Sequence, residues 1–277
     1  MRVISAMALL TLAAAVMPAL AQVAPESATT LVVKGDSRAP AKMAAWEKSG
    51  ELQSASGDAV KGAPRNAVRY DAKMVAWPTA TVKVLTFTRK AGGVLHPITD
   101  ETIVYVLQGS VDASVDGKPV TLLTGDVASL PKGALTNPGK KKADAVVVAW
   151  TAASLVPGAT PAVVRAAATP PAKTGLMGLS RYTFPGNSVR AVSQAPGFKT
   201  TPASAKTDSL IYVTTGGMRF MQDGQTFDVK AGDFIREVAG MQHFWDVSEQ
   251  AGFVTTSALP VGSGPIEVNK ATDRPPQ

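Results

Sequence analysis

The sequence contains no cysteine. A chain without cysteine can form neither disulfide bonds nor iron–sulfur clusters, and it has no thiol for nucleophilic catalysis. Its stability must therefore come from a hydrophobic core. A chain of 277 residues is long enough to build such a core as one large domain or two medium ones.

Histidine is nearly as scarce, because His96 and His243 are the two histidines of the whole chain. Neither lies in a serine–histidine–aspartate arrangement, and no nucleophile elbow is present. The sequence therefore gives no support for a hydrolase that uses a catalytic triad. A metal centre that needs several imidazoles is also hard to build from two.

Long apolar runs are missing after the N-terminus. The run from Val3 to Val16 follows Arg2 and precedes the small-x-small pattern Ala19-Leu20-Ala21, which is typical of a cleaved signal peptide. We expect residues 1–21 to be removed and the protein to be periplasmic or secreted. The alternative is a membrane anchor, but this run is shorter than the roughly 20 residues that span a bilayer. We expect no membrane span in the mature chain.

The charged residues are spread along the chain, although the net charge is +7. The one dense basic cluster, Lys140–Lys142, follows the turn residues Asn137–Gly139 and precedes the strand-like run Ala145–Trp150. No aromatic residues alternate with these lysines to stack on bases. We interpret the cluster as a solvated hairpin tip, and we expect no nucleic-acid partner.

Short β-branched runs separated by turn residues begin at about residue 75, which predicts an all-β fold. Residues 22–74 read as an irregular N-terminal arm with one short helix near Ala41–Lys48. The Pro-rich stretch 153–175 reads as a linker. The expected order is a signal peptide (1–21), an arm (22–74), a first β domain (75–152), the linker (153–175), a second β domain (176–260) and a tail (261–277).

The two β domains are copies of one another, because residue n aligns with residue n + 107 without gaps. Ile103–Val106 lies over Leu210–Val213, and both copies carry their turn residues in register. The repeated turn residues are Gly109 and Gly216, Asp116-Gly117 and Asp223-Gly224, and Gly125-Asp126 and Gly232-Asp233. Glycine recurs where the backbone needs conformations that other residues resist, and each Asp-Gly pair predicts a hairpin turn.

The glycine spacing resembles the cupin superfamily, whose motifs are G(X)5HXH(X)3-4E(X)6G and G(X)5PXG(X)2H(X)3N. Gly109 closes the first motif, and Gly125, Pro131 and Gly133 fit the second; the second copy retains Gly216, Gly232 and Gly240. The resemblance implies a bicupin, that is, two jelly-roll barrels in one chain. Large apolar strand residues such as Tyr105 and Tyr212 are then expected between the barrels.

The resemblance also implies three histidines and one carboxylate around a metal ion in each barrel. The corresponding positions here hold His96, Ile98, Thr102 and Thr136 in the first copy, and Ala203, Ala205, Ser209 and His243 in the second. Three of the four ligands are replaced in each copy. We therefore expect degenerate metal sites, no bound metal and no cofactor.

Two interpretations of the histidines remain open. They are hydrogen-bonded remnants of a former site, or they are partners or general bases for a ligand, since imidazole exchanges protons near neutral pH. The second copy is favoured for ligand binding, because small residues replace its metal ligands. The candidate ligand-binding residues are His243, Trp245, Arg236, Gln242, Ser209, His96, Thr102 and Thr136.

The function expected from these features is the binding of a small molecule by an exported bicupin. The alternative is a bicupin enzyme of the isomerase, lyase or dioxygenase type that uses His243 in an unorthodox or metal-free site. Alternation along the strand places His243 and Trp245 on one face. The identity of the ligand and the formation of a homodimer are left open by the sequence.

Overall fold

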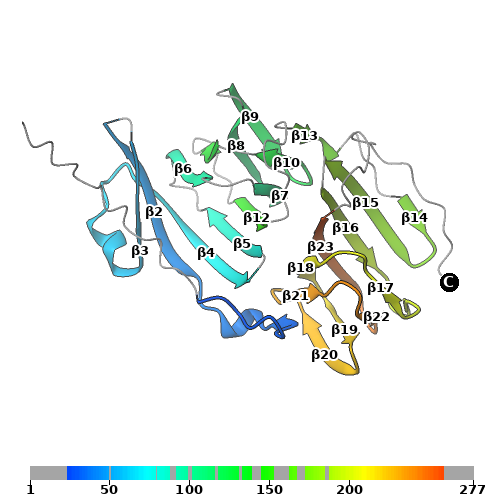
Figure 1. Ribbon diagram of the computed structural model, residues 1–277. Helices are drawn as coiled ribbons and strands as arrows, with labels where there is room; N and C mark the ends of the chain where they lie inside the picture. Colours follow the sequence, from blue (N-terminus) through cyan, green and yellow to red (C-terminus); the bar gives the residue numbers. More distant parts are fainter. Residues whose placement is uncertain are drawn as a thin grey trace, which may run out of the picture.

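The computed structural model describes residues 24–49, 51–78, 80–87, 92–98, 102–115, 118–130, 133–138, 145–152, 162–166, 172–184 and 187–258 (Figure 1). Two 3-10 helices, Gly35–Ser37 and Gly57–Gly62, accompany strands in this part of the chain. The all-β prediction is confirmed. No helix in the described residues is long and apolar enough to cross a membrane. The predicted signal peptide, the tail from residue 261 and the Lys140–Lys142 cluster lie outside the described residues.

The first domain is built from two antiparallel sheets. The larger sheet has the strand order β13 (Ala162–Val164), β10 (Val127–Leu130), β7 (Thr102–Gln108), β12 (Ala145–Ala152), β5 (Ala80–Phe87), β4 (Val68–Trp77), β2 (Ala41–Lys48) and β3 (Glu51–Ser56). The smaller sheet has the order β6 (Gly92–Ile98), β11 (Gly133–Pro138), β8 (Ser110–Val115) and β9 (Lys118–Leu123). Apolar residues between the two sheets form the core of this domain.

The second domain repeats this arrangement. Its larger sheet has the order β1 (Val32–Val33), β21 (Phe234–Glu237), β18 (Ser209–Thr215), β23 (Ala251–Ala258), β16 (Asn187–Gln194), β15 (Met177–Phe184) and β14 (Ala172–Thr174). Its smaller sheet has the order β17 (Ala203–Ser204), β22 (Gln242–Asp246), β19 (Gly217–Gln222) and β20 (Gln225–Lys230). The two-domain, cupin-like architecture expected from the glycine spacing is therefore present.

The sequence repeat is kept in the strand register. β5 and β16 begin at Ala80 and Asn187, and β7 and β18 begin at Thr102 and Ser209, so the offset of 107 holds for both pairs. The turn between β19 and β20 has positive φ at both of its central residues, 51° at Asp223 and 73° at Gly224. These angles are those of a type I′ hairpin turn, which confirms the prediction for the second Asp-Gly pair.

In each domain, an edge strand comes from a segment outside that domain: the N-terminal segment for the second domain and the linker for the first. β1, from the N-terminal segment, pairs with β21 of the second domain, and β13, from the linker, pairs with β10 of the first. In Figure 1 the dark-blue N-terminal segment runs from β2 to lie beside β21. The expected arm thus reaches the second domain, and the linker contributes a strand that the absence of alternation did not predict.

A buried aspartate fixes each borrowed strand, and we call the pair of contacts the aspartate latch. In the second domain, Asp233 accepts hydrogen bonds from the backbone N–H of Gly35 (2.7 Å) and from the ammonium of Lys34 (3.1 Å). In the first domain, Asp126 accepts from the backbone N–H of Ala166 (2.9 Å) and from the guanidinium of Arg165 (2.6 Å). In both copies, the aspartate of the same Gly-Asp turn therefore binds the segment that follows the borrowed edge strand.

The helix predicted near Ala41–Lys48 is wrong, because this stretch is strand β2. Ala, Met, Glu and Lys favour helix in isolation, but β2 pairs with β3 on one side and β4 on the other. Met43 and Ala45 are buried in the core of the first domain. Tertiary pairing thus overrides local propensity, and three stretches of the expected irregular arm, in β2, β3 and β4, extend the larger sheet instead.

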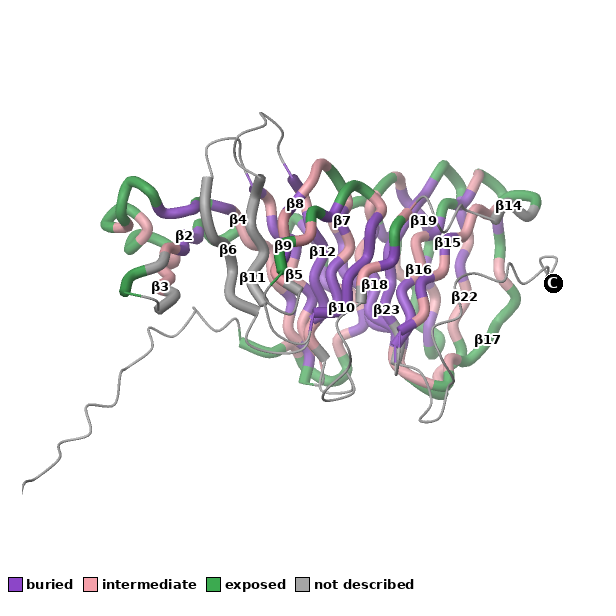
Figure 2. The backbone as a smooth tube through the Cα atoms, turned by 90° about the horizontal axis from the view of Figure 1, so that it is seen from above, coloured by how far each residue is buried: buried purple, intermediate pink, exposed green. Residues whose placement is uncertain are grey.

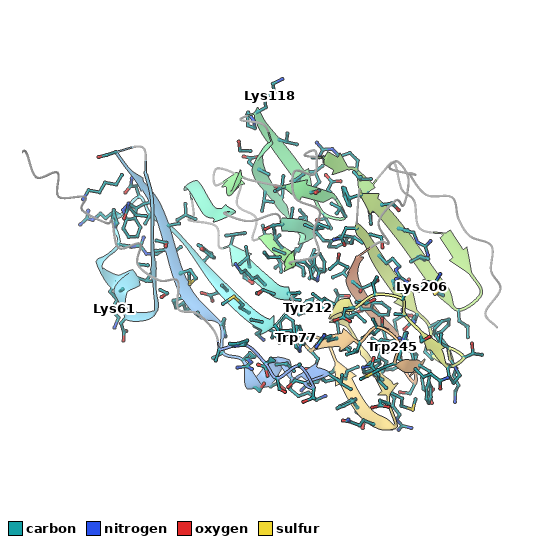
Figure 3. The ribbon with its side chains drawn as sticks, viewed as in Figure 1. Lys61, Trp77, Lys118, Lys206, Tyr212 and Trp245 are labelled. Atoms are coloured by element: carbon teal, nitrogen blue, oxygen red, sulfur yellow. The ribbon has the colours of Figure 1, made fainter. Side chains whose placement is uncertain are left out.

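Another apolar cluster lies between the domains and contains Ile103, Trp77 and Leu210, with Tyr105 and Tyr212 packed against it. Figure 2 shows the buried residues concentrated in the middle of the molecule, where β12, β18 and β23 meet, and Figure 3 shows Trp77 and Tyr212 close together there. The expectation that these strands share their apolar side chains between domains is confirmed.

Candidate functional site

The inner face of the larger sheet in the second domain is graded from apolar to polar. Residues facing inward alternate along each strand, and strand register aligns them into rows across the sheet. The first row is Leu179, Val192, Phe253 and Val213; the second is Arg181, Arg190, Thr255 and Ile211; the third includes Thr183, Ser188, Ser209 and Glu237. Polar side chains thus occupy one end of an otherwise apolar interior.

Glu237 joins the two sheets at this polar end. Its carboxylate oxygen Oε1 accepts a hydrogen bond from the indole Nε1 of Trp245 (3.2 Å) and lies 3.3 Å from His243 Nε2. Glu237 is on β21 of the larger sheet, whereas Trp245 and His243 are on β22 of the smaller one. All three side chains are largely buried, so the carboxylate is screened from bulk water.

The two residues of β22 share a face, as alternation predicted. Trp245 is also part of the core, because its ring packs 4.6 Å from Phe220 and 5.5 Å from Phe253, measured between ring centroids. His243 Nδ1 is buried and has no hydrogen-bond partner among the described residues. A neutral imidazole that donates from Nε2 to Glu237 presents Nδ1 as an acceptor, and a protonated one presents a second donor. This nitrogen can therefore serve a ligand.

Two arginines face the same interior. Arg181 on β15 and Arg190 on β16 are directly opposite in the antiparallel ladder. Burial lowers the pKa of Arg190, the neighbouring Arg181 cation lowers it further, and the Glu237 carboxylate acts in the opposite direction. These three groups are therefore electrostatically coupled inside one domain. Both arginines also make polar contacts within the protein.

Neither the arginine pair nor Glu237 is among the candidate site residues predicted from the sequence. The sequence pattern places residues 176–200 in the second domain without defining strands there, so the inward direction of Arg181 and Arg190 does not emerge from it. The 107-residue offset could have located the two arginines on strands, because it aligns Arg181 with Met74 and Arg190 with Lys83 of the first domain. Alternation along β15 from the apolar Met177 and Leu179 then points Arg181 inward.

The first domain has a different interior at the same positions. Leu130 stands in the place of Glu237 and is fully buried, and Ala149 stands in the place of Thr255. Thr102, the counterpart of Ser209, is buried with its hydroxyl 3.3 Å from that of Thr151. Met74 and Lys83 face each other where the second domain has its arginine pair. The ionic cluster is thus a property of the second domain.

The structure does not bring all the predicted site residues together. Arg236 is on the opposite face of β21 from Glu237; its guanidinium binds the Asp208 carboxylate (2.6 Å) and the Ala28 carbonyl (2.9 Å). Gln242 is exposed. Ser209 and His243 lie in the interior described above with Trp245. Arg236 therefore anchors the N-terminal segment and does not face the interior.

His96 and Thr136 can be placed only by their strands. His96 is on β6 and Thr136 on β11, where the ladder shifts register between Ala134 and Thr136. Their side chains lie outside the described part of the structure. Thr102 belongs to the larger sheet and is buried, so the first domain supplies one placed candidate residue.

The residues of the second domain do not fit a transition-metal centre. Its motif positions offer the imidazole of His243, while Ala203, Ala205 and Ser209 replace the other ligands. Glu237 adds a carboxylate, but its Oε1 is 3.3 Å from His243 Nε2, the distance of a direct contact between the two groups. Within the described residues no group of three or more histidine, aspartate or glutamate side chains converges.

A groove of about 360 Å³ lies elsewhere on the second domain, lined by residues that include Lys34, Arg219, Asp228, Lys230 and Glu249. Several of its charged side chains are exposed and paired, as Arg219 is with Asp228 and Lys230 with Asp36. Exposed ion pairs of this kind contribute little energy in water. The buried cluster around Glu237 is therefore the stronger candidate site.

Comparison with known proteins agrees with this architecture. Residues 78–155 match the family model described as the EutQ-like cupin domain. The first domain is a cupin domain. No curated protein sequence matches it significantly. The match lies in the first domain, and the 107-residue repeat carries the cupin pattern into the second.

Solved cupin structures resemble the chain over most of its length at low sequence identity. The protein Ylba from E. coli has a TM-score of 0.57 and 17% identity, covering 70% of this chain and 84% of that one. An oxalate decarboxylase has a TM-score of 0.60 and 12% identity, covering 82% and 77%. A salicylate 1,2-dioxygenase from Pseudaminobacter salicylatoxidans has a TM-score of 0.51 and 14% identity, covering 67% and 75%. At these identities the similarity concerns the fold.

Proposed function

We propose that this cupin binds a small molecule in the interior of its second domain, beside His243, Glu237 and Trp245. The observation that carries the proposal is the meeting of Glu237 with His243 and Trp245 at the polar end of that interior. A buried cluster of ionisable groups costs stability, and such groups are concentrated at functional sites.

Small side chains at the positions that correspond to the cupin metal ligands support this proposal. Ala203 is exposed and Ala205 is partly exposed, so the end of the domain that carries the polar row reaches solvent. Ser209 and Ser188 add buried hydroxyl groups that can donate or accept hydrogen bonds. A site with an apolar floor and a few convergent polar groups is typical of small-molecule recognition.

The proposal also includes export. The segment from Arg2 to Ala21 has the charge, apolar run and cleavage pattern of a signal peptide, and the absence of cysteine is compatible with an oxidising compartment. Mass spectrometry of the protein recovered from the periplasm of a Gram-negative expression host tests this part. We expect a mature chain that begins at Gln22; an uncleaved chain in the cytoplasm would contradict it.

Calorimetric titration of the mature protein tests ligand binding. The probes are malonate, benzoate, benzyl alcohol and glucose, which present carboxylate, aromatic and hydroxyl groups. At least one probe should saturate with one equivalent, and Glu237→Gln or His243→Ala should weaken it by about tenfold or more, the loss of one or two buried hydrogen bonds. Thr102→Ala in the first domain is the matched control and should leave the affinity unchanged.

A second candidate function is catalysis without a metal, and the contact between Glu237 and His243 favours it. A carboxylate that orients an imidazole is a common arrangement for general acid–base chemistry. Exchange of the methyl hydrogens of pyruvate for solvent deuterium, followed by NMR, would reveal such a base. If His243→Ala abolishes the exchange while the protein stays folded, the catalytic function is supported. If His243→Ala changes only the thermal stability, the catalytic function is rejected and the binding function is kept.

A further inference from the structure

We propose that the ligand of the second domain is a small carboxylate, recognised by Arg181 and Arg190. This inference rests on the proposed function and specifies the chemistry of its ligand. Arg181 and Arg190 stand at directly opposite positions of β15 and β16, and alternation along the two strands turns both toward one interior. Their positive charges act on each other there, and a bound anion would lower this repulsion.

The charges around the arginines favour an anion over a neutral ligand. Among the described groups of this interior, Arg181 and Arg190 contribute two positive charges and Glu237 contributes one negative charge. The Glu237 carboxylate is already engaged by the indole of Trp245 and the imidazole of His243. A net positive interior that is partly closed to water concentrates anions.

The geometry of guanidinium favours a carboxylate. Its planar fork of donors matches the two oxygens of a carboxylate, and such bidentate pairs are stronger than neutral hydrogen bonds. The neighbouring row adds the hydroxyls of Ser188 and Ser209, which can complete the hydrogen bonding of the anion. The row on the other side, with Val192 and Phe253, is apolar and suits the uncharged part of a small organic acid.

The first domain lacks the arginine pair, so the predicted carboxylate binding is specific to the second domain. At the corresponding positions it carries Met74 and Lys83, opposite each other, and Leu130 replaces Glu237. One cation that is not planar cannot form the paired recognition described above. A carboxylate should therefore bind to the second domain and not to the first.

The test is a calorimetric titration of the mature protein with malonate, benzoate, inorganic phosphate and benzyl alcohol, repeated for Arg181→Gln, Arg190→Gln and Arg190→Lys. We expect one equivalent of malonate or benzoate to bind, with an affinity that falls by more than about tenfold in both Gln variants and less in the Lys variant. Lys83→Gln, the counterpart in the first domain, should have no effect.

Thermal unfolding separates recognition from a structural role. Arg190→Gln should remain folded without ligand, and the rise in unfolding temperature that malonate gives the parent protein should vanish in this variant. A lower unfolding temperature for Arg190→Gln, with carboxylate affinity retained, would show that the arginines are structural and would overturn the inference.

The probes distinguish failure of the inference from failure of the proposed function. If benzyl alcohol binds in a His243-dependent manner and no carboxylate does, the small-molecule site stands and the carboxylate inference falls. Phosphate binding that depends on Arg190, without carboxylate binding, also overturns the carboxylate assignment. If none of the probes saturates, neither statement survives.

Discussion

The two domains of this protein share their framework and differ in their interiors. Both hold a borrowed edge strand with the aspartate latch, Asp126 in the first domain and Asp233 in the second. At one inward position, however, the first has a fully buried Leu130 and the second has Glu237 in contact with His243 and Trp245. Duplication has thus kept the contacts that hold the strands and allowed the interior residues to diverge. At this position one domain has a polar cluster and the other has an apolar side chain.

Substituting the interior residue of one domain by its counterpart from the other should have the largest effect on the free energy of unfolding. Leu130→Glu places a carboxylate in an apolar core without the donors that surround Glu237, and it should lower the free energy of unfolding by about 4 kcal/mol or more. The reverse change, Glu237→Leu, leaves the Trp245 indole N–H without an acceptor and should cost about 1–2 kcal/mol. Urea unfolding measures both.

Equal costs for these two substitutions would show that the interiors are equivalent, and the comparison between the domains would fail. A loss below about 1 kcal/mol for Leu130→Glu would have the same meaning, since a carboxylate can be tolerated that well only where donors or water surround it. Leu130→Met, which keeps the size of the side chain, is the control.

The latch should give the next largest effect, and it should be similar in the two domains. Asp233→Ala removes the acceptor for the backbone N–H groups of Gly35 (2.7 Å) and Lys230 (3.0 Å) and for the ammonium of Lys34. We expect a loss of about 3 kcal/mol, because buried donors are left unsatisfied. Asp126→Ala should lose a similar amount by urea unfolding.

Asp228→Ala is the control for the latch, because its carboxylate is exposed and pairs only weakly with Arg219 at 3.4 Å. It should change stability by less than about 0.5 kcal/mol. If Asp233→Ala behaves like this control, the borrowed strand does not depend on the buried aspartate.

Alkaline conditions should reveal the interface between the domains through a smaller effect. Burial, with a smaller contribution from Tyr182, raises the pKa of Tyr105 to about 12, so the folded state favours the neutral phenol. The stability linked to Tyr105 is present below pH 10 and is lost as the pH rises through 12. At pH 11 the loss amounts to about 1 kcal/mol. Tyr105→Phe should flatten the decline of the unfolding midpoint between pH 10 and 12; an unchanged slope would indicate that the phenol is not buried.

Sequence reasoning recovered the fold because turns depend on local chemistry. Asp223 and Gly224 occupy positive φ, which few residue types adopt readily, so their repetition at fixed spacing revealed the two domains. The strand of residues Ala41–Lys48 was missed because its helix-forming composition outweighed any sign of the pairing that it makes with β3 and β4. Local signals therefore predicted the framework better than the pairing of the arm.

The site was only partly predictable for a related reason. His243 and Trp245 lie on one strand, so alternation placed them on one face. Their contact with Glu237 crosses between two sheets, and no local pattern contains that information. Arg236 was selected for its charge, but it faces the other side of β21 and binds Asp208. The arginine pair needed the register of β15 and β16.

The most direct test of the central claim is an NMR titration of the four tryptophan indole N–H signals with malonate, and with benzyl alcohol as the neutral probe. Trp245 donates its indole N–H to Glu237, whereas Trp77 donates to the Thr30 carbonyl (2.9 Å) outside that interior. We predict that the Trp245 signal shifts and saturates while the Trp77 and Trp150 signals stay in place. A probe that saturates without moving the Trp245 signal would contradict a binding site in the second domain.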